Sequence, residues 1–339
     1  MATKKLTQKE IAKALGISPT AVSITLSDPQ TSRVSEERKH VILEYVREHV
    51  PRLYPKISKQ RVILCLPEIN AYSGSVYGGI TSGIQEACRL REWDLDIQMG
   101  PLPDNRVLVR TGKKQTGIIA VVGRDTFEHL EQISKELPLV LVNSQESPLC
   151  CDEVDLDNHA GIELLMKTLY NQGHRRFVFI RDHNGKDRFR HHLRQRTEAF
   201  FGFAISRNLE ISTADCVNVG DYGAAGQAPS YDAMLKKLRS RKTPPTALVC
   251  FNDMVAAQVI HAAHRADLDV PGDFSVTGYD DHEMALQTSP QITTIRHDRS
   301  GMGSMSVDVL AMRIHHPKSP CSRLLTPPQL VSRKSIARI

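Results

Sequence analysis

Residues 6–27 read LTQKEIAKALGISPTAVSITLS, a stretch that predicts two short helices joined by a tight turn. Thr7 and Glu10 have the spacing of a capping box, in which the threonine hydroxyl accepts the N–H of Glu10 and the glutamate carboxylate accepts the N–H of Thr7. The first helix is expected to end at Leu15, because Gly16 follows it and glycine readily takes the left-handed conformation that ends a helix.

The second and third helices of this region have start signals of their own. Ser18 is predicted to cap the second helix, with Pro19 at the first helical position, where no N–H is needed. A third helix is predicted over residues 34–49, with Ser35 as its capping residue and its end before Pro51.

The apolar side chains of the first two helices and their turn can form one small core if the helices cross steeply; they are Ile11, Ala12, Leu15, Ile17, Val22 and Leu26. The second helix then presents Thr20, Ala21, Ser23 and Ile24 on its outer face. Three short helices, a turn glycine and a basic surface predict a helix-turn-helix DNA-binding head whose second helix lies in the major groove. The alternative is a basic helical domain that docks onto another protein.

The charge of the chain is concentrated in this N-terminal region. The 339 residues include 44 Lys and Arg and 38 Asp and Glu, a net charge of +6. Residues 1–61 alone contain twelve basic and six acidic side chains, whereas residues 62–339 contain thirty-two of each. A cationic head on a neutral body is typical of a protein that binds DNA phosphates through its head.

Length and composition predict a globular protein of two or three domains, since 40% of the residues are apolar and 24% are charged. No signal-peptide core and no run of 18 apolar residues occurs, so we expect a cytoplasmic protein with no membrane partner. The seven cysteines show no Cys-x-x-Cys motif and no zinc spacing, so no metal site is expected. No cofactor is expected either. Most of the cysteines should be buried, and a redox role for the adjacent pair Cys150 and Cys151 is the alternative.

After Arg61 the sequence alternates between short apolar runs and helix-length stretches. The predicted strands are 62–66, 117–122, 139–142, 177–180, 247–251 and 274–278, and the predicted helices include 76–90, 159–171, 193–207, 228–239 and 254–266. This alternation predicts α/β architecture, with parallel sheets covered by helices on both faces. Two such sheets would form a cleft, the usual ligand site of doubly wound folds.

Residues 6–27, followed by Val34-Ser-Glu-Glu, resemble the N-terminal signature of the LacI family of bacterial transcription regulators. The body resembles the same family, in the segments 154–161, 173–180, 245–256, 270–281, 293–296 and 328–331. The resemblance implies a helix-turn-helix head (1–50), a linker (51–61) and a periplasmic-binding-protein-like body (62–339) of two doubly wound parallel-sheet lobes. The first lobe is expected to comprise about 62–158 and 291–320, and the second about 159–290 and 321–339.

The family pattern implies a set of DNA-binding residues on the head. Pro19 and Thr20 occupy base-reading positions, and Thr7 and Ser23 occupy phosphate-contacting ones; the expected set also includes Ser18, Ile24, Arg33 and Leu53. Ile24 departs from the family, which usually has an arginine there that can bind guanine. Ile24 therefore either reads the operator by apolar contact or packs against the third helix.

The linker also departs from the family pattern. Residues 49–61, HVPRLYPKISKQR, lack the Ala-x-x-Leu repeat of the family's hinge helix and contain Pro51 and Pro55. Leu53 is the one apolar candidate for insertion into the minor groove. An extended linker whose basic residues contact phosphates, and an operator that is little bent, are the expectations.

The resemblance also implies an effector site, comprising Arg196, Tyr222, Asn252 and Asp280 of the second lobe and a loop from Ser73 to Tyr77 that closes the pocket from the first lobe. A guanidinium, a carboxylate and an amide beside an aromatic ring suit a sugar. The basic stretch 181–196 leaves open a phosphorylated or acidic sugar. Without the resemblance, Asn252 and Asp280 would be interpreted as helix caps and Arg196 as a surface charge.

The sequence thus predicts a sugar-responsive transcriptional regulator, most simply a repressor, that acts as a homodimer on a pseudo-palindromic DNA operator. No heptad repeat follows the body, so no tetramerising coiled coil is expected. A sugar-binding transport component would share the body, but it would need an export signal and would have no DNA-binding head. Enzymatic activity is not expected, because the sequence contains no Walker loop, dinucleotide fingerprint, Gly-x-Ser-x-Gly motif or zinc constellation.

Overall fold

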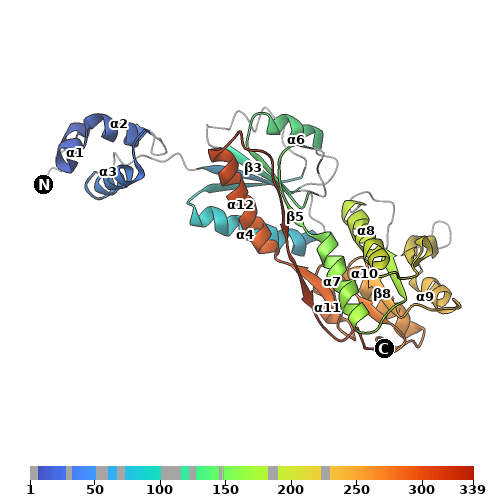
Figure 1. Ribbon diagram of the computed structural model, residues 1–339. Helices are drawn as coiled ribbons and strands as arrows, with labels where there is room; N and C mark the ends of the chain where they lie inside the picture. Colours follow the sequence, from blue (N-terminus) through green and yellow to red (C-terminus); the bar gives the residue numbers. More distant parts are fainter. Residues whose placement is uncertain are drawn as a thin grey trace. The chain divides into compact units, whose positions relative to one another are not determined.

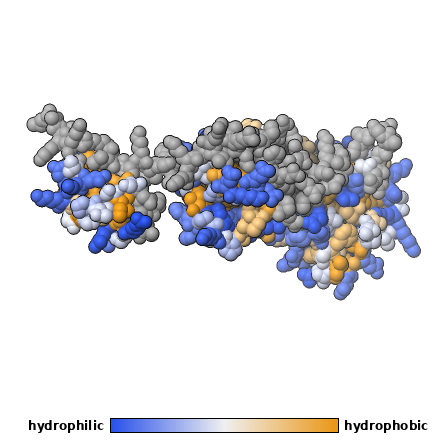
Figure 2. All heavy atoms as spheres, turned by 90° about the horizontal axis from the view of Figure 1, so that it is seen from above, coloured by the Kyte–Doolittle hydropathy of each residue, from blue (hydrophilic) through white to orange (hydrophobic). Residues whose placement is uncertain are grey.

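The structure is a computed structural model that describes residues 7–27, 33–50, 60–66, 73–100, 116–121, 127–144, 147, 149–181, 190–222 and 230–339. The chain forms two compact units, Met1–Gln60 and Arg61–Ile339. They are the head and the body, and each is described by itself. In the described residues, hydrophilic side chains cover much of the face shown in Figure 2, with smaller apolar areas between them.

The head consists of three helices, α1 (Gln8–Leu15), α2 (Pro19–Ser27) and α3 (Glu36–His49) (Figure 1). The predicted capping box is present: the N–H of Thr7 donates to Glu10 Oε2 at 2.7 Å, and the N–H of Glu10 donates to Thr7 Oγ1 at 3.4 Å. Gly16 has φ 64°, which confirms the left-handed end of α1. Ser18 Oγ accepts the N–H of Ala21 at 3.1 Å and so caps α2.

The head has a small hydrophobic core of its own. Its buried members are Ile11, Ala12, Val22, Ile42, Val46 and Val50, with Leu15, Ile17, Leu26 and Tyr45 packed against them. The predicted shared core of the first two helices is thus confirmed, and α3 completes it. Ser35 stands at the N-cap of α3 but makes no side-chain capping bond, so that part of the prediction was wrong.

The first lobe of the body is built on a six-stranded sheet in the order β11-β5-β4-β3-β1-β2, and every neighbouring pair of strands is parallel. Its strands are β1 (Arg61–Leu66), β2 (Asp94–Met99), β3 (Thr116–Val121), β4 (Leu139–Val142), β5 (Asp152–Leu156) and β11 (Arg323–Thr326). The helices that accompany it are α4 (Ser73–Leu90), α6 (Phe127–Ser134) and α12 (Arg299–His315). Separate apolar clusters form with α4 and α12 and with α6, so the sheet has a core on each face.

Glycines let α4 and α12 approach until their backbones nearly touch. A Cβ atom on Gly83 would lie 1.9 Å from the carbonyl oxygen of Ser300, and one on Gly303 would lie 2.1 Å from the carbonyl oxygen of Ile80. Neither neighbouring atom belongs to a side chain that could turn away. The two helices are therefore held in one closely packed arrangement.

The second lobe is built on a four-stranded parallel sheet in the order β7-β6-β8-β9. Its strands are β6 (Phe177–Arg181), β7 (Cys216–Asn218), β8 (Ala247–Cys250) and β9 (Ser275–Thr277). Its helices are α7 (Asn158–Asn171), α8 (Arg190–Ser206), α9 (Tyr231–Arg239), α10 (Asp253–Arg265) and α11 (Met284–Gln287), with short 3-10 turns η4 (Thr213–Asp215) and η5 (Val219–Tyr222). Apolar clusters with α7 and α8 and with α9 and α10 provide its core.

The chain crosses between the lobes at a small two-stranded antiparallel sheet. This sheet pairs β10 (Thr294–His297) with β12 (Pro328–Val331). Residues 321–339 were expected in the second lobe, but β11 pairs with β5 in the first lobe, so that prediction was wrong for Arg323–Thr326. The predicted fold class, an all-α head with two doubly wound parallel-sheet lobes, is confirmed.

Candidate functional site

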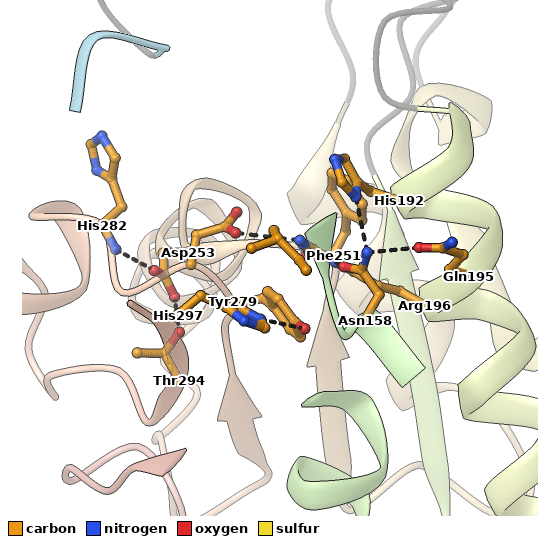
Figure 3. A network of polar contacts seen from close by, with 12 residues as sticks. Asn158, His192, Gln195, Arg196, Phe251, Asp253, Tyr279, His282, Thr294 and His297 are labelled. Atoms are coloured by element: carbon orange, nitrogen blue, oxygen red, sulfur yellow. Dashed lines mark hydrogen bonds and ion pairs between the residues drawn. The ribbon is translucent and has the colours of Figure 1, made fainter. Parts of the chain in front are cut away.

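The candidate site is organised around Arg196, a buried arginine of α8 (Figure 3). Only 2% of the residue is exposed, and each nitrogen of its guanidinium donates a hydrogen bond. Nε donates to Asn158 Oδ1 at 2.8 Å, Nη1 to the carbonyl oxygen of Phe251 at 2.6 Å, and Nη2 to Asp280 Oδ1 at 3.3 Å. The guanidinium carbon also lies 3.6 Å from the centre of the Tyr279 ring. The interpretation of Arg196 as a surface charge was therefore wrong.

Neighbouring residues fix the groups that receive these bonds. Asn158 begins α7, and its amide nitrogen lies 2.9 Å from His192 Nδ1 and 2.7 Å from Gln195 Oε1, which leaves its oxygen to face Arg196. Gly161, one turn further along α7, makes room for Tyr279, because a Cβ atom there would lie 2.1 Å from the tyrosine hydroxyl oxygen.

Tyr279 joins the guanidinium to a buried histidine. Its hydroxyl oxygen lies 3.0 Å from Nε2 of His297, the last residue of β10. Burial, together with the charges of Arg196 and Arg299, lowers the pKa of His297 to about 4, against the opposing effect of Asp280. His297 is therefore neutral at pH 7, and it contacts Tyr279 without adding a charge beside Arg196.

Asp280 connects the second lobe to the first. Its Oδ1 atom accepts from Arg196 of α8 and also from Nη2 of Arg299, at 3.1 Å, and Arg299 is the first residue of α12. Burial opposes the ionisation of Asp280, but the two guanidinium groups outweigh it and hold the pKa of Asp280 below its ordinary value. One carboxylate oxygen is thus shared by arginines from both lobes.

The backbone at this carboxylate is strained. Asp280 has φ 98° and Asp281 has φ 50°, values that side-chain-bearing residues rarely adopt. The N–H of Asp280 donates to the carbonyl oxygen of Ile295 at 2.9 Å, and Asp281 accepts from Arg296 and Arg333. Such strain persists only where the surrounding contacts enforce it, and it concentrates at ligand-binding sites.

A second buried carboxylic acid, Asp253, supports the backbone segment that contains Asp280 and Asp281. It accepts Thr294 Oγ1 at 2.6 Å and the N–H of His282 at 2.7 Å, and its own N–H donates to the carbonyl oxygen of Tyr279 at 3.0 Å. Burial raises the pKa of Asp253 to about 8, with Asp280 and Asp281 adding to the effect. Asp253 therefore holds the Tyr279–Asp281 segment in place chiefly through hydrogen bonds.

The chain is similar to known regulators along nearly its whole length. Residues 166–336 match the family described as periplasmic binding protein-like domain. The ribose operon repressor of Haemophilus influenzae is 24% identical, over 97% of this chain and 98% of its own length. Two solved structures, the complex of the transcriptional regulator CelR with cellobiose and the lac repressor dimer bound to operator and the anti-inducer ONPF, each have a TM-score of 0.64 and 20% identity. Each covers 98% of this chain and 100% of its own. The chain belongs to the LacI family of transcriptional regulators.

Membership of the LacI family confirms the resemblance recognised in the sequence. Because the matched relatives are named as transcriptional repressors and regulators, this LacI-family chain is a DNA-binding regulator and not an enzyme. Within the described ranges, no group of three or more side chains could hold a metal ion. No helix in the described part of the chain is both long and apolar enough to span a bilayer.

Of the effector residues expected from the LacI family, the structure brings Arg196 and Asp280 together. Asn252 follows Phe251, whose carbonyl oxygen accepts from Arg196, but Asn252 Oδ1 accepts the N–H of Val255 at 3.0 Å, so Asn252 is a helix cap for α10, as the alternative held. Tyr222 ends η5, and its side chain lies outside the described part of the structure.

The contribution expected from the first lobe differs from the prediction. Residues 73–77 are the start of α4 and not a loop, so that expectation was wrong. Tyr77 is half-buried and packs against the core between the sheet and α12, whereas the side chain of Ser73 lies outside the described set. A side chain that reaches the site from the first lobe is instead that of Arg299, which was not predicted from the sequence.

The DNA-binding residues expected on the head lie mostly on its surface. Ser18, Pro19 and Thr20 are exposed at the start of α2, and Ser23 and Ile24 are partly exposed further along it. Thr7 and Arg33 are exposed too, although Thr7 is engaged with Glu10. Ile24 is not a member of the head's hydrophobic cluster. Leu53 lies outside the described residues.

Several residues of the network were not predicted from the sequence. Asn158, Phe251 and Tyr279 all lie inside the segments on which the family resemblance rested, directly beside Asp157, Asn252 and Asp280. Their place in these segments could therefore have marked them as candidate site residues. His192 and His297 had no such signal.

Proposed function

We propose that this regulator is a repressor whose body binds a sugar or sugar derivative between its lobes, at Arg196 and Asp280. The observation that supports this most is the shared Oδ1 atom of Asp280, which accepts from Arg196 of the second lobe and from Arg299 of the first. A polar ligand that binds this carboxylate or this guanidinium alters a contact between the lobes. The CelR structure with cellobiose and the name of the ribose operon repressor support a sugar.

The site has the chemistry that sugar hydroxyls need. A hydroxyl group can donate to Asp280 while accepting from a guanidinium, so one sugar edge satisfies both charged partners. In the described structure these partners satisfy each other, so the ligand must compete with the existing ion pairs. It shifts the regulator only if it binds one arrangement of the lobes more tightly than the other.

The head reads the operator with α2. Pro19 and Thr20 are exposed at its start, where the recognition helix of a helix-turn-helix meets base edges, and Thr20 offers a hydroxyl and a methyl group. The regulator acts as a homodimer on two half-sites, as the lac repressor structure with operator contains a dimer. Its place of action is the cytoplasm, where the DNA lies.

The effector site is tested by thermal shift of the full-length protein with sugars, sugar acids and sugar phosphates. A cognate ligand at a hundred times its Kd should stabilise the wild type by about 2.7 kcal/mol. Arg196→Lys keeps the charge but cannot reproduce the three directed hydrogen bonds, so it should lose most of this gain.

The matched control is Arg265→Lys, which alters an exposed arginine of the same lobe paired with Asp232. It should leave the ligand-induced shift unchanged. Equal ligand stabilisation of Arg196→Lys and the wild type would show that the effector binds elsewhere.

Operator recognition is tested by selecting binding sites from random DNA with the full-length protein. The selected sequence should be pseudo-palindromic, and log K should fall by about 0.9 per phosphate contact for each tenfold rise in salt. Thr20→Ala should weaken binding to the selected site by about 1 kcal/mol or more and leave thermal stability unchanged. If Thr20→Ala bound the selected site as the wild type does, α2 would not be the recognition helix.

A further inference from the structure

Two cysteines that are far apart in the sequence lie together in the first lobe. The thiol of Cys150 donates to Cys321 Sγ at 3.3 Å, and both residues are exposed. Cys65, Cys88 and Cys250 are buried, and Cys216 is partly buried in the other lobe. The pair therefore differs from the remaining cysteines in both exposure and proximity.

The fold determines this proximity. Cys150 precedes β5 and Cys321 precedes β11, and these two strands are neighbours with Glu153 opposite Arg323. The backbone between them is tied down, since Ser322 donates through both its N–H and its hydroxyl to Asp152 Oδ1, at 2.9 and 2.8 Å. The thiols are consequently held side by side on two anchored segments.

Arg313, near the end of α12, strengthens this anchorage. Its Nε donates to Asp152 Oδ2 at 2.6 Å, and its Nη1 donates to the carbonyl oxygen of Ser319 at 2.6 Å. The segment that contains Cys321 is thus held to the start of β5 at several points. A sulfur–sulfur bond here requires a small approach of the two sulfurs and no rearrangement of the strands.

A small oxidant can reach the pair. Both cysteines line a cavity of about 380 Å³, together with Cys151, Lys135, Pro138 and Arg313. Cys151 is half-buried against the core beside α6, and burial raises its pKa to about 12. The pKa of Cys321 is also raised, by burial and by the neighbouring Cys150 thiol, so exposure and proximity, and not thiol acidity, distinguish the pair from Cys151. The described residues contain no group of three metal-ligating side chains, so a thiol reaction suits this place better than a metal ion.

We propose that Cys150 and Cys321 are an oxidation site at which a peroxide converts the two thiols into an intramolecular disulfide. One thiolate attacks the peroxide, so that a sulfur–oxygen bond forms, the oxygen–oxygen bond breaks and hydroxide leaves to become water. The second sulfur attacks the sulfenic acid, the disulfide forms and a second water leaves. The two thiols lose two electrons and two protons, and hydrogen peroxide is reduced to two waters.

The oxidation site is separate from the effector site. The strands β5 and β11, which follow Cys150 and Cys321, are parallel to β1. The two thiols therefore lie at the end of the sheet where the strands begin, which is the end at which β1 starts with Arg61. Asn158 of the effector site follows the other end of β5, about 16 Å away for a five-residue strand. Oxidation can therefore proceed whether or not the effector is bound.

The test is oxidation of the full-length protein with hydrogen peroxide, followed by alkylation, unfolding and thiol counting. Seven free thiols should fall to five, and a peptide map without reductant should contain a Cys150–Cys321 crosslink, about 2 Da lighter than its reduced peptides. Dithiothreitol should restore seven thiols. The crosslink should form at the same rate with and without the sugar that gives the largest thermal shift.

Single substitutions locate the reaction. Cys150→Ser and Cys321→Ser should each abolish the crosslink, whereas Cys151→Ser, beside the pair in both sequence and space, should retain it. The proposal is overturned if the map shows Cys150 joined to Cys151, if crosslinks join two chains, if all seven thiols survive, or if single cysteines are oxidised to sulfinic acid without pairing. The wild-type peptide map decides these outcomes even if a variant folds poorly.

Discussion

Asp280→Asn removes the one carboxylate that Arg196 and Arg299 share. The arginines are 2% and 13% exposed and Asp280 is 14% exposed, so water screens the loss poorly. Breaking a buried ion pair costs about 3–5 kcal/mol, and the amide oxygen of asparagine retains one acceptor, so we expect a loss of about 2–3 kcal/mol. For a body of this size the midpoint of thermal unfolding should fall by about 5 °C.

The pH dependence of this loss is fixed by the pKa of Asp280. Because the pKa is below its ordinary value in the folded protein, the carboxylate stabilises the fold above the unfolded pKa of about 4, and this contribution is lost as the pH falls through the folded pKa. The difference between wild type and Asp280→Asn should therefore be full at pH 7 and should shrink below about pH 4.

Differential scanning calorimetry across pH, without ligand, measures this difference. The control is Asp232→Asn, which breaks an exposed pair with Arg265 in the same lobe and should not move the midpoint measurably. An Asp280→Asn protein that melts with the wild type at pH 7 would refute the idea that the shared carboxylate holds the two arginines.

Three further outcomes follow from the packing and the titration of buried groups. Gly83→Ala forces a methyl group against the backbone of Ser300 and should destabilise the body by about 1–3 kcal/mol in calorimetry. The control Gly78→Ala, whose added Cβ meets no atom within 4 Å, should not destabilise it. Equal effects of the two substitutions would refute the close contact between α4 and α12. Asp253 has a raised pKa, so its contribution to stability is full below about pH 4 and is lost as the pH rises towards 8; Asp253→Asn should therefore gain stability relative to the wild type between pH 5 and 8, and a constant difference in chemical denaturation would contradict this. Thr7→Ala removes the capping box and should lower the stability of the head by about 1 kcal/mol, measured by circular dichroism, with an unchanged head melt as the contrary result.

The fold was predictable wherever a strand is apolar throughout. The strand at 139–142 was predicted with its observed bounds, and β1 differs from its prediction by one residue. The strand β5 was missed because its sequence, DEVDL, looks polar. Asp152 and Asp155 are nevertheless fully buried, since arginines of distant segments pair with them. The β-propensity of the residues cannot reveal such a strand, because the arginines that pair with its aspartates come from segments that are distant in the sequence.

The site was predictable only where the chain itself signals it. Arg196 and Asp280 were found because each lies in a recognisable segment, and the structure joins them. The loop expected at 73–77 rested on the family resemblance, and these residues are instead the start of α4, a helix that was predicted to begin at residue 76. Arg299 had no local signal, because only the arrangement of the lobes gives it a role.

The helix α12 relates the two sites of the body to each other. Arg299 at its first turn pairs with Asp280, and Arg313 near its last turn pairs with Asp152 beside the thiol pair. The seventeen residues of α12 span about 25 Å. This helix therefore reaches from the carboxyl ends of the strands of the first sheet to the ends at which those strands begin. Its contact with α4 at Gly83 and Gly303 leaves no room for the two helices to approach further. Because the Cys150–Cys321 crosslink is expected to form at the same rate with and without a bound sugar, a ligand that changes the contact of Arg299 should break the ion pair and leave α12 in place. Moving α12 together with α4 would displace the anchored segment of Cys321 and change that rate.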